Sequence, residues 1–169
     1  MTQRARTGAD ERDAVGAPFD SIVTRSLMLI DQLQRRLAWL PPTAARFTVG
    51  VIFVQSGWGK LHNLDAVVKF FTELGVPAPQ LQAPFVAGTE FLGGVLLLLG
   101  LATRFAAIPL MGVMTVALLT ALRGQIHEVA DLFGLAEFCY IVLLVGLAVF
   151  GAGPLSLDAI LRRRFASRS

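Results

Sequence analysis

Four apolar stretches, separated by Gly, Pro and charged residues, constrain this chain more than any other feature. They cover residues 47–59, 81–102, 105–122 and 132–150. A helix needs roughly 20 apolar residues to cross a bilayer, a length that the last three stretches reach or approach. The first stretch rises only about 20 Å. It can span only if Arg46 and Lys60 extend their basic groups to opposite interfaces.

The composition points to the same class of protein. Hydrophobic residues make up 54% of the chain and charged residues 16%, whereas soluble domains average about 25% charged residues. The apolar fraction excludes a disordered protein, and a single cysteine, Cys139, excludes a disulfide scaffold. The net charge is +3, but most basic residues flank apolar stretches. They therefore indicate membrane topology and anionic lipid contacts rather than nucleic-acid binding.

The N-terminal region divides into two predicted parts. Residues 1–17 are polar and of mixed charge, which predicts a disordered tail. Within residues 18–42, apolar residues recur at helical spacing with arginines between them, which predicts an amphipathic interfacial helix ended by Pro41 and Pro42. A short amphipathic surface helix is also predicted over residues 64–75.

These elements predict an all-α membrane protein: an antiparallel four-helix transmembrane bundle with an N-terminal amphipathic interfacial helix. The transmembrane domain would cover residues 44–161, followed by a basic cytoplasmic tail at 162–169. With four spans, the 15 basic residues divide into 12 on the side of the termini and three opposite, the latter being Lys60, Lys69 and Arg123. The positive-inside rule therefore predicts a multi-pass protein of the plasma (inner) membrane with both termini in the cytoplasm.

Ionisable residues inside apolar stretches are costly and indicate function. The predicted topology brings five polar groups to the outer half of the bundle, which form a candidate intramembrane cluster: Gln55, Lys60, Glu90, Glu137 and Tyr140. Close approach of the helices is expected at five glycines: Gly50, Gly57, Gly93, Gly94 and Gly100.

Two interpretations of the polar cluster remain open. The cluster could form a pocket for a quinone head group or another small polar ligand, in which a glutamate handles protons. Alternatively, Lys60 or Gln55 neutralises Glu90 and holds the helices in register. In the resting state we expect Lys60 to pair with Glu90. The alternatives are a protonated Glu90, or a hydrogen bond from Gln55 or Tyr140.

The sequence offers few other candidates for chemistry. A lone cysteine cannot carry out intramolecular Cys-x-x-Cys exchange. The two histidines, His62 and His127, lie outside the apolar stretches without a second ligand at helical spacing. Neither a metal site nor haem ligation is therefore predicted.

Five short motifs, in order along the chain, carry a family resemblance. They are RFTVGVIF at 46–53, GWGKL at 57–61, EFLGG at 90–94, LGLATRFAA at 99–107 and GAGPLSLD at 151–158. Their order, their spacing and their placement around four apolar stretches resemble the DoxX-like family of small four-helix membrane proteins, which are distantly related to the surfeit-locus family. The resemblance covers about residues 44–161.

The resemblance implies a membrane subunit associated with a redox system. The family takes its name from a subunit of an archaeal quinone-linked oxidase, and the related DoxD proteins belong to thiosulfate:quinone oxidoreductase. It thus implies a non-autonomous subunit of a quinone-linked oxidoreductase, with quinone as a candidate cofactor and a redox enzyme or a second copy as partner. Two alternatives stay open: a non-catalytic scaffold that recruits partners, and a small-solute carrier acting as a dimer.

Overall fold

The computed structural model describes residues 25–166, and every regular element within them is helical. The chain divides into two units, Met1–Ala38 and Trp39–Ser169. In the first unit, residues 25–37 form a helix. The expected tail at 1–17, the start of the expected helix at 18–42 and the last three residues of the basic tail lie outside the described residues.

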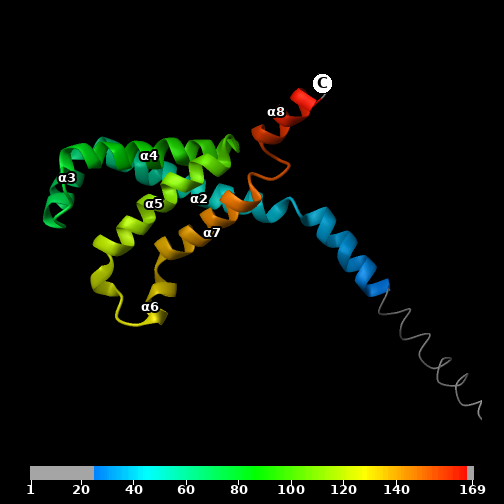
Figure 1. Ribbon diagram of the computed structural model, residues 1–169, viewed down its shortest axis with the longest axis horizontal. Coiled ribbons are helices and arrows are strands. Elements are labelled where there is room, and N and C mark those ends of the chain that lie inside the picture. Colours follow the sequence, from blue (N-terminus) through cyan, green and yellow to red (C-terminus); the bar gives the residue numbers. More distant parts are fainter. Residues whose placement is uncertain (1–24, 167–169) are drawn as a thin grey trace, which may run out of the picture. The chain divides into compact units, whose positions relative to one another are not determined.

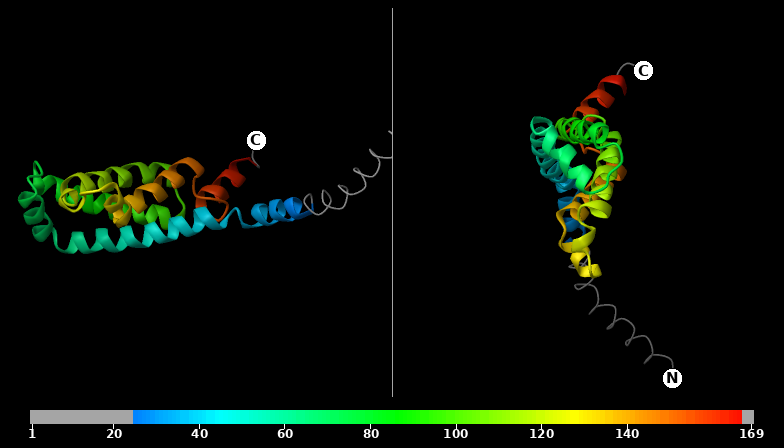
Figure 2. Two further views of the ribbon diagram at one scale, coloured as in Figure 1. Left: turned by 90° about the horizontal axis from the view of Figure 1, so that it is seen from below. Right: turned by 90° about the vertical axis from the view of Figure 1, so that its left-hand side faces the viewer.

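The second unit contains all the helices that pack on one another. In chain order these are α2 (Leu40–His62), α3 (Leu64–Glu73), α4 (Pro79–Leu99), α5 (Thr103–Thr120), the 3-10 helix η1 (Arg123–Gln125), α6 (Val129–Gly134), α7 (Ala136–Phe150) and α8 (Leu157–Ala166). Helices α2, α4, α5 and α7 share one core, while α3 and α8 lie at opposite ends of this assembly (Figures 1 and 2). We call these ends the Lys60 end, which carries α3, and the Arg46 end, which carries α8.

The helices have the length and hydropathy of membrane spans. Within residues 25–166, three helical runs are long and apolar enough to cross a bilayer: Arg25–His62, Pro79–Leu99 and Thr103–Thr120. Helix α7 is apolar but shorter, with 15 residues. The described part of the chain therefore has the architecture of an all-helical membrane protein.

Small residues let α2 and α4 approach closely in opposite directions. A Cβ atom at Gly57 would lie 2.8 Å from the backbone oxygen of Ala87, and one at Gly94 would lie 2.9 Å from the backbone oxygen of Gly50. Five of the six buried residues of α4 recur at intervals of three and four, the sixth being Gly93: Ala83, Ala87, Glu90, Gly94 and Leu97. This spacing places them on one helix face, turned towards the other helices.

The turn between α4 and α5 depends on left-handed backbone. Gly100 ends α4 with a φ of 65°, and Ala102 follows with a φ of 48°. Glycine adopts this conformation without steric cost, which explains its place after the last helical residue. Gly100 is also a site of close approach, because a Cβ atom there would overlap the guanidinium of Arg46 on α2. Gly93 packs against Leu110 of α5, 2.9 Å from where its Cβ would lie.

The fourth apolar stretch does not form one helix. The backbone at Leu135 is extended, with φ of −82° and ψ of 129°, and separates α6 from α7. The expectation of a continuous span over 132–150 is therefore wrong, because Gly134 and Leu135 break it. Glu137 consequently lies in the first turn of α7 rather than well inside a span.

The first apolar stretch also differs from expectation. Helix α2 has 23 residues and contains Pro41 and Pro42 in its first turn. Proline fits there because the first N–H groups of a helix have no intrahelical partner. The two prolines therefore open α2, whereas the sequence pattern suggested that they only end the preceding helix.

Two glycine variants of α2, one at the contact and one away from it, test the close approach of α2 and α4. We expect Gly57→Ala to lower the free energy of unfolding by about 1–3 kcal/mol, because the added methyl group meets the backbone of α4. Gly59→Ala is the control, since a Cβ atom at that exposed position meets nothing within 4 Å. Reversible unfolding in mixed detergent micelles measures both. Equal stability of the two variants would contradict the packing.

Candidate functional site

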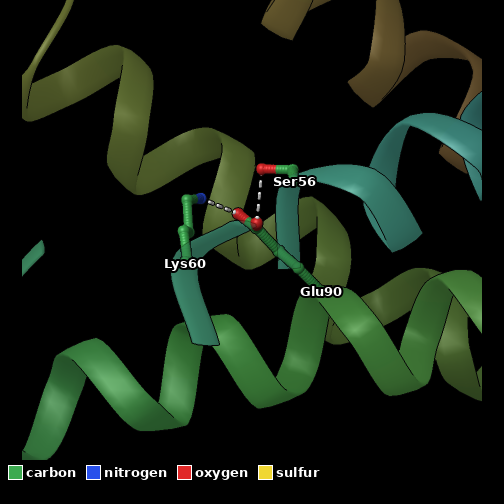
Figure 3. A network of polar contacts seen from close by, with 3 residues as sticks. All are labelled: Ser56, Lys60 and Glu90. Carbon is green, nitrogen blue, oxygen red and sulfur yellow. Dashed lines mark hydrogen bonds and ion pairs between the residues drawn. The ribbon is translucent and has the colours of Figure 1, made fainter. Parts of the chain in front are cut away.

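The Glu90 side chain on α4 is completely buried and accepts two hydrogen bonds from α2 (Figure 3). Lys60 Nζ lies 2.5 Å from Oε1, and Ser56 Oγ lies 2.8 Å from Oε2. The Lys60 side chain remains 30% exposed. The expected ion pair between Lys60 and Glu90 is therefore present, with each carboxylate oxygen satisfied by a different donor.

The sequence of α2 explains why these groups meet. Ser56 and Lys60 are four residues apart, so they lie on the same helix face. Gly57 on this side of α2 brings the helix against the backbone of Ala87 and Phe91. Burial of a lone carboxylate would be costly, and breaking a buried pair by removing one partner typically costs about 3–5 kcal/mol. The short helix separation allows both donors to reach Glu90.

The other three members of the expected cluster lie elsewhere. Gln55 is exposed, because it precedes Ser56 by about 100° around the helix and cannot share its face. Glu137 lies at the start of α7, and the Tyr140 ring packs against Phe53 with centroids 6.2 Å apart. Among the described residues, Glu90 takes its hydrogen bonds from Ser56 and Lys60 instead. Ser56 was missed, although its spacing from Lys60 could have indicated it.

A cavity of about 560 Å³ adjoins this ion pair. It lies between α3, α4 and α5, and Lys60 of α2 lines it. Most of the lining is apolar, with side chains that include Val67, Phe70, Phe71, Phe85, Val113 and Val116. The cavity thus combines an apolar wall with one cationic group, which suits a ligand with an apolar body and an oxygen-bearing head.

At the other end of the assembly, Arg46 is buried rather than extended to an interface. Its side chain is 2% exposed. Nη1 donates to the carbonyl oxygen of Ala152 at 3.0 Å, and Nη2 donates to that of Leu155 at 2.7 Å. The expectation that Arg46 snorkels is therefore wrong. Carbonyl groups of the loop between α7 and α8 accept hydrogen bonds from both terminal nitrogens of the guanidinium, while its buried Nε has no hydrogen-bond partner among the described residues.

Asp158, the first acidic residue of α8, ties that helix to the turn between α4 and α5. Its carboxylate accepts hydrogen bonds from the backbone N–H groups of Ala102 at 2.9 Å and Thr103 at 3.3 Å. Its own N–H donates to the carbonyl oxygen of Gly100 at 3.0 Å. An acidic side chain at the start of α5 also has favourable electrostatics, because N–H groups point out of that helix end.

The remaining polar residues do not form a metal site within residues 25–166, where no group of three or more His, Cys, Asp and Glu converges. In the first turn of α6, the carboxylate of Asp131 accepts hydrogen bonds from the N–H groups of Glu128 and His127, which precede the helix, both at 2.9 Å. These two bonds hold the pKa of Asp131 below its usual value. The Asp131 side chain thus holds the backbone of this loop.

The ion pair can be tested by a double-mutant cycle. We expect Lys60→Met to lower the free energy of unfolding by about 3–5 kcal/mol, because it leaves the Glu90 carboxylate buried without a counter-charge. Glu90→Gln should cost less, since the partly exposed Lys60 can turn its ammonium group towards water. The double variant should recover part of the combined loss.

Unfolding in mixed detergent micelles gives the three free energies. Lys69→Met on α3 is the control, because this exposed lysine does not line the cavity and has no contact with Glu90. Strictly additive losses for Lys60→Met and Glu90→Gln would exclude an energetically coupled pair.

Comparison with known proteins agrees with this architecture. The DoxX family model matches residues 42–123. CatD of Bacillus subtilis, described as a candidate oxidoreductase, is 34% identical over 115 residues, which cover 67% of this chain and 81% of CatD. The inner membrane protein YqjF of Escherichia coli is 29% identical over 124 residues, covering 72% and 92% of the two chains.

A third relative is the uncharacterised membrane protein Rv3486 of Mycobacterium tuberculosis, 32% identical over 137 residues, which cover 73% of this chain and 84% of that protein. No solved structure matches the chain. Taken with the apolar helices and the matched region, these likenesses assign the protein: the chain belongs to the DoxX family of membrane proteins.

Proposed function

We propose that this DoxX-family protein is a membrane subunit of a quinone-linked redox system and binds quinone in the cavity beside Lys60. The observation that carries the proposal is the contact between an apolar cavity of about 560 Å³ and the Lys60–Glu90 ion pair. The redox association is supported by the name of its Bacillus subtilis relative, which is described as a candidate oxidoreductase.

The residues of the cavity fit a quinone head group. An ammonium group has three N–H donors, and Lys60 gives one of them to Glu90. The remaining donors suit a carbonyl oxygen, while Phe70, Phe71 and Phe85 offer apolar surface to a flat ring and its tail. Thr89 and Gln82 add polar groups to the lining.

A bound quinone supplies reversible two-electron, two-proton reduction at its carbonyl oxygens. In this proposal Lys60 donates a hydrogen bond to one of those oxygens and orients the ring. Glu90 stays ionised, keeps its hydrogen bond from Ser56 and holds the ammonium group of Lys60 in place. Lys60, whose side chain is 30% exposed, would take up from water each of the two protons that it passes to the quinone oxygens. A partner redox enzyme delivers the electrons, so that the chain acts as a non-autonomous subunit.

The proposal includes a membrane arrangement. Helices α2, α4, α5 and α7 cross the inner membrane as an antiparallel four-helix bundle, and the helix at 25–37 lies on the membrane surface. The 15 residues of α7 rise about 22 Å, less than the hydrocarbon thickness of about 30 Å. Local thinning of the bilayer and the position of α6 at the interface accommodate the shorter helix.

Sidedness is tested with reporter fusions. Because 12 of the 15 basic residues lie on the side of the termini in this arrangement, both termini should be cytoplasmic and the segment around Gly75 should be external. A fluorescent protein fused after Ser169 should fluoresce, and alkaline phosphatase fused after Gly75 should be active. If the phosphatase fused after Gly75 were inactive and a fluorescent protein at the same position fluoresced, the segment around Gly75 would be cytoplasmic. The proposed orientation would then be wrong.

Quinone binding is tested by filling the cavity without touching the ion pair. Gly112 lines the cavity, and a Cβ atom there would meet nothing within 4 Å. We expect Gly112→Leu to fold normally and to weaken binding of a short-chain quinone analogue at least about tenfold, a loss of roughly 1.4 kcal/mol. Equilibrium binding to the protein in lipid nanodiscs measures the affinity.

The matched control is Gly146→Leu on α7, which has equally open surroundings but does not line the cavity. It should bind the analogue like the wild type. Undiminished binding by Gly112→Leu would place the quinone elsewhere, and absence of saturable binding to the wild type would favour a non-catalytic scaffold.

A further inference from the structure

A second hollow lies at the Arg46 end of the assembly, away from the cavity beside Lys60. Its volume is about 170 Å³, and it lies between the first turn of α5, the loop after α7 and the first turn of α8. The residues that line it include Arg104, Gly151, Ser156 and Asp158. Unlike the larger cavity, this hollow is built mainly from backbone and polar side chains.

Arg104 gives the hollow its available charge. The residue is exposed and has no ion pair within the described part of the chain. Its guanidinium lies against Gly151, where a Cβ atom would be 3.3 Å from Nε and 3.8 Å from Nη2. The one carboxylate in the lining, Asp158, already accepts hydrogen bonds from the N–H groups of Ala102 and Thr103. An anion at Arg104 therefore meets an accessible cation and a carboxylate that is engaged elsewhere.

The surroundings of Arg104 are amphipathic. Phe105, the next residue on α5, is 79% exposed, and Phe150, at the end of α7, is 80% exposed. Both residues belong to apolar helices that end or begin at the Arg46 end of the assembly. At this end α4 finishes at Leu99, α5 begins at Thr103 and α7 finishes at Phe150. A cation at the ends of apolar helices, beside exposed aromatic rings, matches a head group with acyl chains attached.

We propose that Arg104 and this hollow bind the head group of an anionic phospholipid, whose acyl chains lie along Phe105 and Phe150. Arginine binds phosphate oxygens with two parallel N–H donors, and such charge-assisted hydrogen bonds are stronger than neutral ones. The site favours a negatively charged head group, because Arg104 is exposed, whereas the carboxylate of Asp158 is engaged by the N–H groups of Ala102 and Thr103. The site is independent of quinone binding, since it lies at the opposite end of the assembly.

Native mass spectrometry of the full chain in detergent tests the proposal. The probes are phosphatidylglycerol and phosphatidylethanolamine with identical acyl chains, each titrated onto the protein. We expect the wild type to bind phosphatidylglycerol about five- to tenfold more tightly than phosphatidylethanolamine, because one basic residue near the membrane surface contributes about that much to the binding of an anionic lipid. Arg104→Gln should abolish this preference, and Arg104→Lys should retain part of it.

Arg123→Gln is the matched control, because Arg123 is also exposed but follows the other end of α5. It should keep the preference for phosphatidylglycerol. Equal binding of the two lipids by the wild type, or an undiminished preference in Arg104→Gln, would overturn the proposal. Displacement of the lipid by millimolar inorganic phosphate would likewise overturn it, since the ligand would then be a soluble anion.

Discussion

A carboxylate without contact to water governs the geometry of this protein. Glu90 is completely buried between helices, and it is tolerated only because Lys60 and Ser56 reach both of its oxygens from α2. That reach requires two helix backbones to lie in contact, which glycine at position 57 permits. Through the same face of α4, Gly93 fixes how closely α5 can approach. The buried charge thus requires the close spacing of α2 and α4, and the cavity lies beside the lysine that neutralises it.

Each end of the helix assembly contains a buried charged side chain, and the two ends stabilise that charge in different ways. At one end a lysine and a glutamate neutralise one another, and the lysine stays partly accessible to the cavity. At the other end Arg46 binds backbone carbonyl groups and is almost fully enclosed. A lysine whose side chain is 30% exposed can offer a hydrogen bond to a ligand, whereas an enclosed guanidinium can only hold its loop. This contrast favours the Lys60 end for chemistry and the Arg46 end for assembly.

Hydropathy and helical spacing were enough to predict the helical class, most apolar helices and the pairing of Glu90 with Lys60. The pairing could be inferred because burial of one charge in an apolar stretch requires another within reach. The break at Leu135 was missed, since hydropathy is continuous across it and only the backbone shows the extended residue. The partners of Arg46 were missed for a different reason. They are carbonyl oxygens more than 100 residues away, and every residue type carries that group.

The position of Arg46 also affects when this buried charge can meet its hydrogen-bond partners during synthesis. The charges of α2 and α4 are only 30 residues apart and can neutralise one another as a hairpin soon after both helices emerge. Arg46, by contrast, has its partners 106 and 109 residues downstream, in the loop that follows the last helix of the shared core. The first helix of the assembly is therefore closed by the last loop. A chain that stops between the end of α7 and residue 152 contains every helix of the shared core but neither carbonyl group, so Arg46 lacks both of the hydrogen-bond partners that it has in the complete assembly.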